Sequence, residues 1–390
     1  MEHLLLKIAI LMCGLICLAA SNPVTAEDVA NPCRLVLPSV LPAVVGHEVN
    51  IYFDNVVLVP DRRQLIFDVE CARGMQQDER WTYIPKASEI GDIGLTIDIR
   101  DASNKVIASG KTIIRIVAAD AGTGKEISCL IIGDSLTNAS IYPEEILNLC
   151  KSSGNPILKL YGTHHVEGTS PENRHEGYGG WTFERFVTFY SENRTSDDIG
   201  TRCSPFVYME DGKATLDFKR YVREQCGGKS PDFVTIELGC NDIFGSNEAD
   251  QQSTIDRTLG FADKLLKAIL DAGANTKIGL VMLPPPAASQ DAFGNNYGCG
   301  QTRWQYRRNQ HRFTEQMISK YGGRENERIY LIPDYVNVDT EHGFPTEVVP
   351  ANSRTAEKIT RLANAVHPSE SGYKQMADSI YAWVKEILAK

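Results

Sequence analysis

Residues 127–138 read ISCLIIGDSLTN, and this stretch decides which fold the C-terminal part of the chain adopts. A run of apolar residues stops at Gly133 and is followed at once by Asp134 and Ser135. A short apolar run bounded by turn residues predicts a fully buried strand. The serine after it is either part of a surface turn or a nucleophile presented at the edge of a sheet. The rest of the chain has to decide between the two.

Strand-like and helix-like segments alternate from residue 127 to the C-terminus. Further strands are predicted at 156–162, 232–239, 277–283 and 329–333. Helices are predicted at 142–151, 180–190, 217–225, 254–273 and 372–388. This alternation is typical of a doubly wound, mostly parallel sheet, in which sites form at the carboxyl ends of strands. The polar and aromatic segment 284–310 is predicted as a long loop that lines a substrate cleft.

The segment before this region has a different pattern. Residues from about 33 to 120 contain short runs rich in valine, isoleucine and aromatic residues, separated by turn residues. The pattern predicts a small antiparallel β-sandwich. We therefore expect an accessory domain at 27–122 and a catalytic domain at 127–390. The accessory domain either binds polysaccharide or buttresses the catalytic domain, and the second interpretation is favoured.

Residues 1–26 are typical of an export signal. The apolar run Ile8–Ala20 follows a weakly basic start, and Val24-Thr25-Ala26 offers a cleavage site. The alternative is a short membrane anchor, but the run is short for a spanning helix. We expect a secreted or periplasmic bacterial protein. Of its ten cysteines, those outside the signal permit disulfides but include no CxxC pair, so a zinc site is not expected.

The composition narrows the classes of partner. Hydrophobic residues make up 42% and charged residues 23% of the 390-residue chain, which is ordinary for a soluble globular protein. The formal net charge of −10 argues against a nucleic-acid binder or a protein that binds anionic membranes. Neutral substrates fit this charge. The oligomeric state is left open.

Three further segments could complete a serine-based site. A serine nucleophile needs a base, usually histidine, and His367 stands in the loop NAVHPSESGY before the last predicted helix. An ester transition state needs donors for its oxyanion. Candidates are the glycine-rich EGYGGWT at 176–182 and the ELGCNDIF at 237–244. Taken singly, each segment is explained by ordinary turn chemistry.

The order of these segments is more specific than any one of them. Gly-Asp-Ser-Leu is followed by a glycine block, then Gly-x-Asn-Asp, then a C-terminal His-Pro. This order resembles the SGNH hydrolase superfamily, also called the GDSL esterase/lipase family, over residues 127–390. The resemblance implies a flavodoxin-like α/β/α sandwich and neither a metal nor an organic cofactor.

The resemblance also implies roles for individual residues. Ser135 matches the nucleophile, and its backbone N–H is one oxyanion donor. Gly180 and Asn241 match the second and third donors, and His367 matches the base. The family usually has an aspartate three residues before the histidine, where this chain has Asn364.

Asn364 brings no negative charge, so it would stabilise the imidazolium less than aspartate does. We favour a working Ser–His dyad, helped by Asn364 or by a backbone carbonyl. The alternatives are a different acid that reaches the histidine and a non-catalytic descendant of the family.

The stretch RHEGYGGWTFERF at 174–186 resembles the second block of carbohydrate-active members. Arg174, His175 and Glu176 are candidates for binding sugar hydroxyls, with a loop-fixing salt bridge as the equal alternative. Trp181 either stacks on a sugar ring or packs against the start of a helix. Trp304 is a further candidate sugar contact.

The N-terminal β region likewise resembles the accessory sandwich of secreted bacterial carbohydrate esterases. The leading hypothesis is an exported serine esterase that removes acyl groups, acetyl foremost, from a carbohydrate. A lipase or phospholipase is the runner-up within the enzymes. The other classes are a carbohydrate-binding protein on a retired hydrolase fold and a structural envelope protein.

Overall fold

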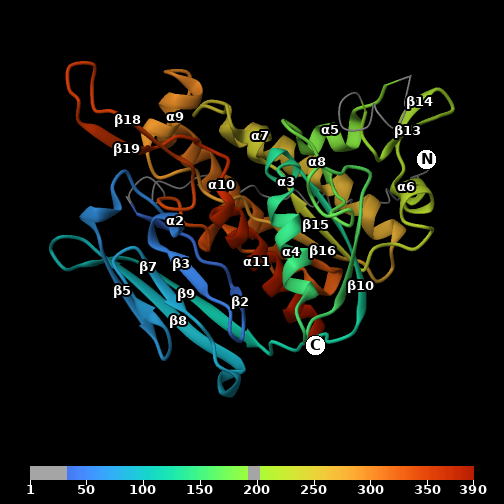
Figure 1. The fold of residues 1–390 in the computed structure, drawn as a ribbon, viewed down its shortest axis with the longest axis horizontal. Helices are drawn as coiled ribbons and strands as arrows, with labels where there is room; N and C mark the ends of the chain where they lie inside the picture. The colour runs from blue at the N-terminus through green and yellow to red at the C-terminus, as the bar shows by residue number, and fades with distance from the viewer. Residues whose placement is uncertain (1–32, 192–202) are drawn as a thin grey trace, which may run out of the picture. The chain divides into compact units, whose positions relative to one another are not determined.

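The computed structural model describes residues 33–191 and 203–390, and Cys33–Lys390 form one compact unit (Figure 1). The predicted export signal at 1–26 lies outside the described residues and stays a prediction. Within the described ranges, no helix is both long and apolar enough to cross a membrane. The same ranges hold no group of three or more His, Cys, Asp or Glu side chains placed to bind a metal ion.

A parallel sheet forms the centre of the C-terminal region. Its strands are β10 (Glu126–Gly133), β11 (Ile157–Tyr161), β15 (Phe233–Glu237), β16 (Lys277–Val281) and β17 (Ile329–Ile332). They lie side by side in the order β11-β10-β15-β16-β17, and every pair is parallel. In chain order this is 2-1-3-4-5, the flavodoxin-like arrangement. The predicted α/β fold is confirmed.

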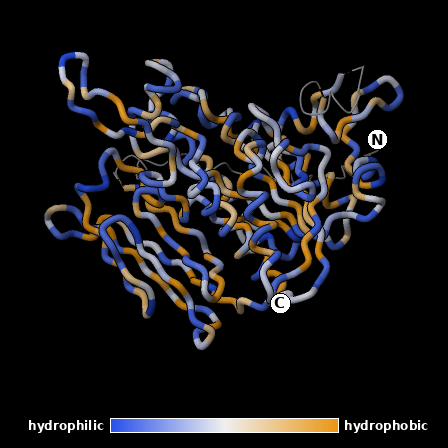
Figure 2. Tube along the Cα trace, viewed as in Figure 1, coloured by the Kyte–Doolittle hydropathy of each residue, from blue (hydrophilic) through white to orange (hydrophobic). Residues whose placement is uncertain are grey.

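Helices cover the sheet and exclude water from it. They are α4 (Ile141–Lys151), α5 (Phe183–Thr188), α6 (Phe218–Gln225), α8 (Gln251–Ala272), α10 (Arg303–Tyr321) and α11 (Glu370–Leu388). Helix α4 packs on α11, while α8 contacts α5, α6 and α10. The strands between them are hydrophobic along most of their length, as Figure 2 shows. Strands buried on both faces are typical of parallel sheets.

Several short elements lie at the carboxyl ends of the strands or lead to them. They are α3 (Ser135–Asn138), β12 (Glu176–Gly177), α7 (Cys240–Ile243), α9 (Gln290–Tyr297) and the hairpin β18 (Thr346–Pro350) and β19 (Lys358–Leu362). A second hairpin, β13 (Val207–Glu210) and β14 (Lys213–Leu216), precedes α6.

The prediction of a long loop at 284–310 is wrong, because α9 and the start of α10 occupy it. Helix α10 shows no clear apolar periodicity because much of its buried face is polar. The buried polar side chains of α10 include Arg307, Asn309, Gln310 and His311.

The N-terminal region contains two small sheets. One has the order β2 (Val40–Val44), β9 (Val106–Val117), β8 (Gly91–Arg100) and β5 (Ile66–Cys71), and the other has β3 (Val49–Tyr52), β7 (Arg80–Tyr83) and β6 (Met75–Gln76). The predicted all-β character is confirmed, but β2 and β9 run parallel. One of the short runs rich in valine and aromatic residues, at 48–59, is divided by the helical turn α2 (Phe53–Val56), after which β4 (Val57–Leu58) pairs with β1 (Arg34–Leu35).

Contacts between the two regions are extensive. The apolar cluster between the small sheets includes Met282, Tyr335 and Val336, which come from the α/β region. Arg307 of α10 is fully buried and donates hydrogen bonds to the backbone carbonyls of Asp54 and Val57. The guanidinium of this helix residue therefore satisfies backbone oxygens of the other region.

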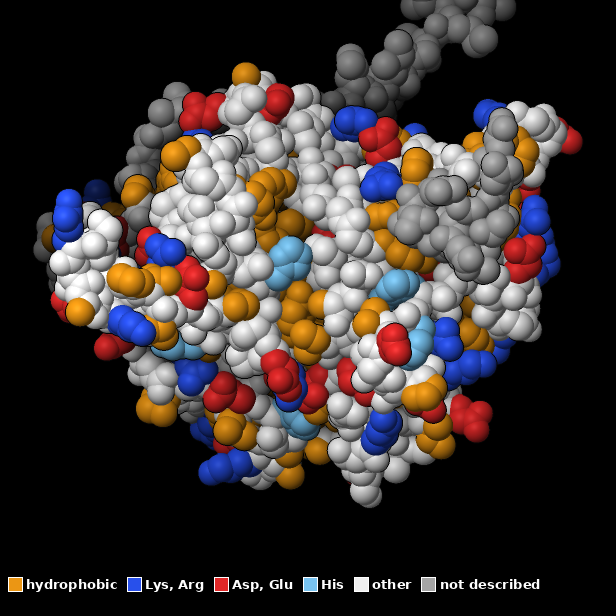
Figure 3. All heavy atoms as spheres, turned by 45° about the horizontal axis from the view of Figure 1, so that its top comes forward, with side chains coloured by type: hydrophobic (Ala, Val, Ile, Leu, Met, Phe, Trp, Pro, Cys, Tyr) orange, Lys and Arg blue, Asp and Glu red, His pale blue; other side chains and the backbone are white. Residues whose placement is uncertain are grey.

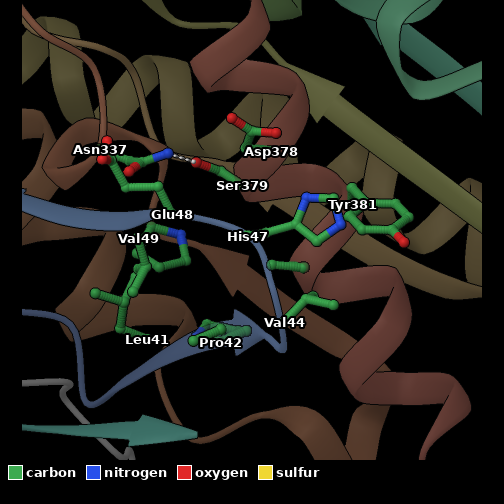
Figure 4. A pocket seen from close by; sticks show the side chains of 13 residues that line it. Leu41, Pro42, Val44, His47, Glu48, Val49, Asn337, Asp378, Ser379 and Tyr381 are labelled. Atoms are coloured by element: carbon green, nitrogen blue, oxygen red, sulfur yellow. Dashed lines mark hydrogen bonds between the residues drawn. The ribbon is translucent and has the colours of Figure 1, made fainter. Parts of the chain in front are cut away.

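A small hollow marks another part of this contact, between the β2–β3 turn and α11 (Figure 4). His47 and Tyr381 lie ring to ring there, with centroids 5.2 Å apart, and Asn337 donates a hydrogen bond to Ser379 (3.4 Å). The free space is about 20 Å³, which is room for about one water molecule. The residues lining it include neither Ser135 nor His367, so the hollow is separate from the predicted site.

Candidate active site

The turn from β10 into α3 presents Ser135. A Cβ atom at Gly133 would stand 1.8 Å from Thr137 Oγ1, so the strand can turn this tightly only with glycine there. Asp134 caps the following helical turn, because its Oδ1 accepts the N–H of Leu136 at 2.9 Å. The Ser135 side chain is left half-buried at the carboxyl end of the strand.

His367 lies beside this serine, although 232 residues separate them in the chain. Its Nε2 is 2.8 Å from Ser135 Oγ. Two contacts hold the loop that carries it: Ala365 N–H donates to Asn296 Oδ1 (2.7 Å), and Ala287 N–H donates to Ala365 O (3.0 Å). Burial lowers the pKa of His367 below its ordinary value. The imidazole is therefore neutral at neutral pH and can accept a proton.

Asn364 shapes the same loop through the backbone. Its Oδ1 accepts the N–H groups of Val366 (3.1 Å) and His367 (2.9 Å), which is the pattern of an Asx turn. Within the described part of the chain, burial is the only influence that shifts the pKa of His367. The Asn364 side-chain carbonyl oxygen thus contacts the backbone of the loop that carries His367.

Asn241 follows the neighbouring strand β15 and lies in the first turn of α7. Its Nδ2 donates to Asp134 Oδ2 (2.9 Å) and to the backbone carbonyl of Trp181 (3.1 Å). Asp134 therefore joins the serine turn to this amide. Both amide hydrogens have an acceptor in this state, so an oxyanion would have to take the place of the Trp181 carbonyl.

Gly180 lies on the other side of the same edge. Strand β12 pairs with the end of β10, and Tyr178 N–H donates to Gly133 O at 3.1 Å. Gly180 is exposed and has φ +74°, a conformation that favours glycine. Among the described residues, neither the Gly180 N–H nor the Ser135 N–H makes a backbone hydrogen bond outside regular elements. The structure brings the segments of all predicted oxyanion donors to one edge of the sheet.

His175 was a candidate for binding sugar hydroxyls, with a loop-fixing role as the equal alternative, and the structure buries it completely. Its Nδ1 accepts Gly177 N–H at 3.0 Å, so Nε2 carries the proton and donates it to Ser140 Oγ at 2.7 Å. Burial lowers the pKa of His175 to about 3, so the ring stays neutral. His175 therefore connects Ser140, which lies between α3 and α4, with Gly177 of the glycine block.

Glu176 and Trp181 also lie inside the scaffold and not on a substrate surface. The Glu176 carboxylate accepts hydrogen bonds from Thr163 N–H (2.7 Å), from the Tyr221 hydroxyl (2.6 Å) and from Tyr178. Trp181 is 1% exposed and packs among aromatic rings, Phe186 included. Of the two interpretations for Trp181, packing at a helix start is the one that the structure shows.

Arg174 and Trp304 keep part of their surface open. Arg174 Nε donates to the carbonyl of Pro171 at 3.2 Å. Trp304 lies in the first turn of α10, next to Arg303, whose Nε donates to Ala287 O at 3.1 Å. Since Ala287 bonds to Ala365 in the loop that carries His367, Trp304 lies one residue from a contact that supports this loop.

Sequence reasoning missed two acidic residues near the site. Asp242 accepts the N–H of Phe183 at 3.2 Å and so fixes the start of α5 after the glycine block. Glu237 ends β15 and is fully buried. The sequence held one signal for Glu237, which is an acidic residue in the mostly apolar run DFVTIELG. A buried acid needs hydrogen-bond partners or a bound proton, so such a residue is unusual in a strand core.

A polar cavity of about 610 Å³ lies at the contact between the two regions, and its lining includes neither Ser135 nor His367. One wall is Ala288, whose neighbour Ala287 bonds to Ala365. Figure 3 shows the molecule turned so that the top of Figure 1 comes forward. On this face, histidine side chains lie at the surface among apolar, acidic and basic side chains. The charged residues that line the cavity are Asp54, Asp61, Arg62, Arg63, Glu79, Arg303 and Glu341.

Several solved structures resemble this chain at low identity. A family 3 carbohydrate esterase from Clostridium thermocellum is 15% identical and has a TM-score of 0.39, with 68% of this chain and 98% of that chain covered. A family 3 carbohydrate esterase from Talaromyces cellulolyticus is also 15% identical (TM-score 0.35; 67% and 98% covered). A putative GDSL-like lipase from Parabacteroides merdae is 13% identical (TM-score 0.34; 69% and 99% covered).

Comparison with curated proteins gives no match. The sequence profile of the GDSL-like lipase/acylhydrolase family matches residues 130–380, a range that includes the serine turn, the glycine block, Asn241 and His367. The resemblance that the order of motifs indicated is therefore confirmed. This chain belongs to the GDSL-like lipase/acylhydrolase family.

Proposed function

We propose that this protein is an exported serine esterase that removes acyl groups, acetyl foremost, from a carbohydrate. The observation that carries the proposal is the 2.8 Å distance between Ser135 Oγ and His367 Nε2. This pair lies where β10 and β15 end, which is the switch point of a 2-1-3-4-5 sheet, where ligands bind in such folds.

The reaction follows from the position of these groups. Ser135 Oγ attacks the ester carbonyl carbon and gives its proton to His367 Nε2. The carbonyl oxygen becomes an oxyanion, which accepts hydrogen bonds from the N–H groups of Ser135 and Gly180 and from Asn241, whose amide then leaves the Trp181 carbonyl. His367 donates the proton to the departing sugar oxygen, which leaves an acyl-serine. Water, deprotonated by His367, then attacks the acyl carbon. The bond to Ser135 Oγ breaks, the carboxylic acid leaves, and His367 returns the proton to Oγ.

In this scheme Ser135 and His367 act as a dyad, without a third side chain that supplies negative charge. Asn364 sets the shape of the loop through backbone hydrogen bonds and supplies no charge to stabilise the imidazolium. The lowered pKa of His367 agrees with this scheme, since an adjacent carboxylate would raise it.

Replacing Asn364 with aspartate tests the dyad. The carboxylate of Asn364→Asp can still accept both backbone N–H groups, and its negative charge raises the pKa of His367. In a plot of kcat against pH, we expect the rise on the acid side to move to higher pH. We expect the plateau value of kcat to increase about tenfold. The measurement is the pH dependence of p-nitrophenyl acetate hydrolysis.

The matched control is Asn364→Ala, which removes the acceptor for both N–H groups without adding charge. It should lower kcat and leave the rise on the acid side in place. If Asn364→Asp has the same pH profile of kcat and the same plateau value as the wild type, a negative charge at this position does not stabilise the His367 imidazolium.

The polar cavity would hold a part of a carbohydrate substrate away from the reacting ester, because neither Ser135 nor His367 lines it. Its volume of about 610 Å³ is in the range of ligand sites, and its walls carry carboxylates and guanidinium groups that suit hydroxyl groups. Asp54 and Arg303 pair across it at 2.7 Å, so the wall is built from both regions of the chain.

The test is hydrolysis of the acetate, butyrate and octanoate esters of p-nitrophenol, together with labelling by a fluorophosphonate. We expect turnover to fall from acetate to octanoate, and Ser135 to be labelled. Faster turnover of octanoate would favour the lipase alternative. Absence of both turnover and labelling, repeated with acetylated glycans, would overturn the proposal in favour of a carbohydrate-binding protein on a hydrolase fold.

A further inference from the structure

Glu237 is a buried acid without an ordinary partner. It is the last residue of β15, in register with Gly133 of β10, and it is 0% exposed. Among the described residues, no side-chain N–H or hydroxyl group donates to its carboxyl oxygens, and the backbone N–H of Asp134 is the donor that favours their charged form. An ionised carboxylate would be costly in such a place, because burial with so few donors strongly disfavours the charged form.

The carboxyl group of Glu237 meets a second buried carboxyl group. It lies within hydrogen-bonding distance of Asp134, which is also 0% exposed. Two ionised carboxylates cannot share such a contact, so one of them carries a proton. Asp134 accepts two N–H groups, from Leu136 and from Asn241, whereas among the described residues Glu237 has the backbone N–H of Asp134 alone. The donors stabilise charge on Asp134, which leaves the proton on Glu237.

We propose that Glu237 is a positioning residue that keeps its proton at neutral pH and donates it in a hydrogen bond to Asp134. Asp134 thereby stays in place as the acceptor for the serine turn and for the Asn241 amide. Glu237 touches neither the substrate nor the reacting atoms. It acts through Asp134, whose Oδ2 sets the direction of the amide that would meet the oxyanion.

The surroundings of the pair agree with a bound proton. Burial and the charge of Asp134 raise the pKa of Glu237 well above its ordinary value, and burial raises the pKa of Asp134 to about 7. The other described titratable groups that interact with the pair bring no positive charge. They are Asp242, Asp334, Tyr142, Tyr306, Tyr373 and Cys240.

The proton on Glu237 has a consequence for stability. In the unfolded chain this residue loses its proton near its ordinary pKa of 4.5, whereas the folded protein keeps it to a much higher pH. The folded state therefore loses stability relative to the unfolded state as the pH rises above 4.5, until the folded pKa is reached. A glutamine at this position does not titrate, so it removes this loss while it can still donate an N–H to Asp134.

The experiment compares wild type, Glu237→Gln and Glu237→Leu in the full chain. Thermal unfolding between pH 4.5 and 8 should show Tm of the glutamine variant rising relative to wild type as the pH increases. With p-nitrophenyl acetate, Glu237→Leu should lower kcat about tenfold or more with little change in KM, because an oxyanion donor is misdirected. Glu237→Gln should restore most of this loss.

Two results would overturn the inference. One is a Tm profile of Glu237→Gln that runs parallel to wild type over the whole pH range. The other is a leucine variant that folds and keeps the kcat of the wild type. The kcat comparison rests on the proposed esterase activity, but the Tm comparison does not. If the wild type hydrolyses no ester, the proposed function fails, and the Tm profiles still decide where the proton resides.

Discussion

Ser135→Ala lowers kcat for p-nitrophenyl acetate by at least about 10⁴-fold, because no other group can form the acyl intermediate. His367→Ala has an effect of similar size, since the hydroxyl without a base is a poor nucleophile. The two side chains are 2.8 Å apart and act as one unit. The double variant should therefore be no slower than the slower single variant. Initial rates for the four proteins form the test.

A matched control uses a histidine outside the site. His342 is mostly exposed and lies 3.2 Å from Asp339, so His342→Ala should leave kcat unchanged. Folding of every variant is checked by thermal unfolding. A Ser135→Ala protein that keeps a tenth or more of the wild-type kcat would show that the nucleophile lies elsewhere.

Arg307→Met should lower the free energy of unfolding by about 3 to 5 kcal/mol, since it leaves several buried acceptors without a donor. The guanidinium donates to the carbonyls of Asp54 and Val57 and to Gln310 Oε1 (3.0 Å). Burial lowers the pKa of Arg307 to about 10, so the side chain stays charged at neutral pH and its donors stay in place. Urea unfolding at pH 7.5 measures the change.

The next residue of the same helix provides the control. Arg308 pairs with Glu248, whose side chain is 82% exposed. Arg308→Met should cost less than about 1 kcal/mol, as surface ion pairs usually do. Equal losses for the two variants would mean that the buried donors of α10 contribute nothing beyond ordinary helix packing.

The parts of the fold that the sequence predicted are those with strong local signals. The inner strands β10, β15 and β16 are buried along most of their length, so each appears as a mostly apolar run. The serine, the glycine block, Asn241 and His367 were found because their order along the chain is specific. The structure brings these segments to one edge of the sheet, as the parallel topology requires.

The parts that were missed depend on contacts between distant residues. Helix α10 was not predicted because it buries arginine, asparagine, glutamine and histidine side chains, whose partners come from other segments. His175 and Glu176 carry functional groups typical of a binding site, and only the folded chain shows that Ser140 and Tyr221 already occupy those groups. No pattern in one sequence distinguishes a polar group satisfied inside the protein from one that awaits a ligand.

The apolar cluster between the small sheets is completed by Met282, Tyr335 and Val336 from the α/β region. Each region thus contributes to a core that neither could close alone. A recombination event that exchanged residues 33–117 for an unrelated sandwich would leave these side chains facing a surface that does not fit them. The two regions are therefore constrained to diverge together, and a redesign that transplants the hydrolase must carry its sandwich with it.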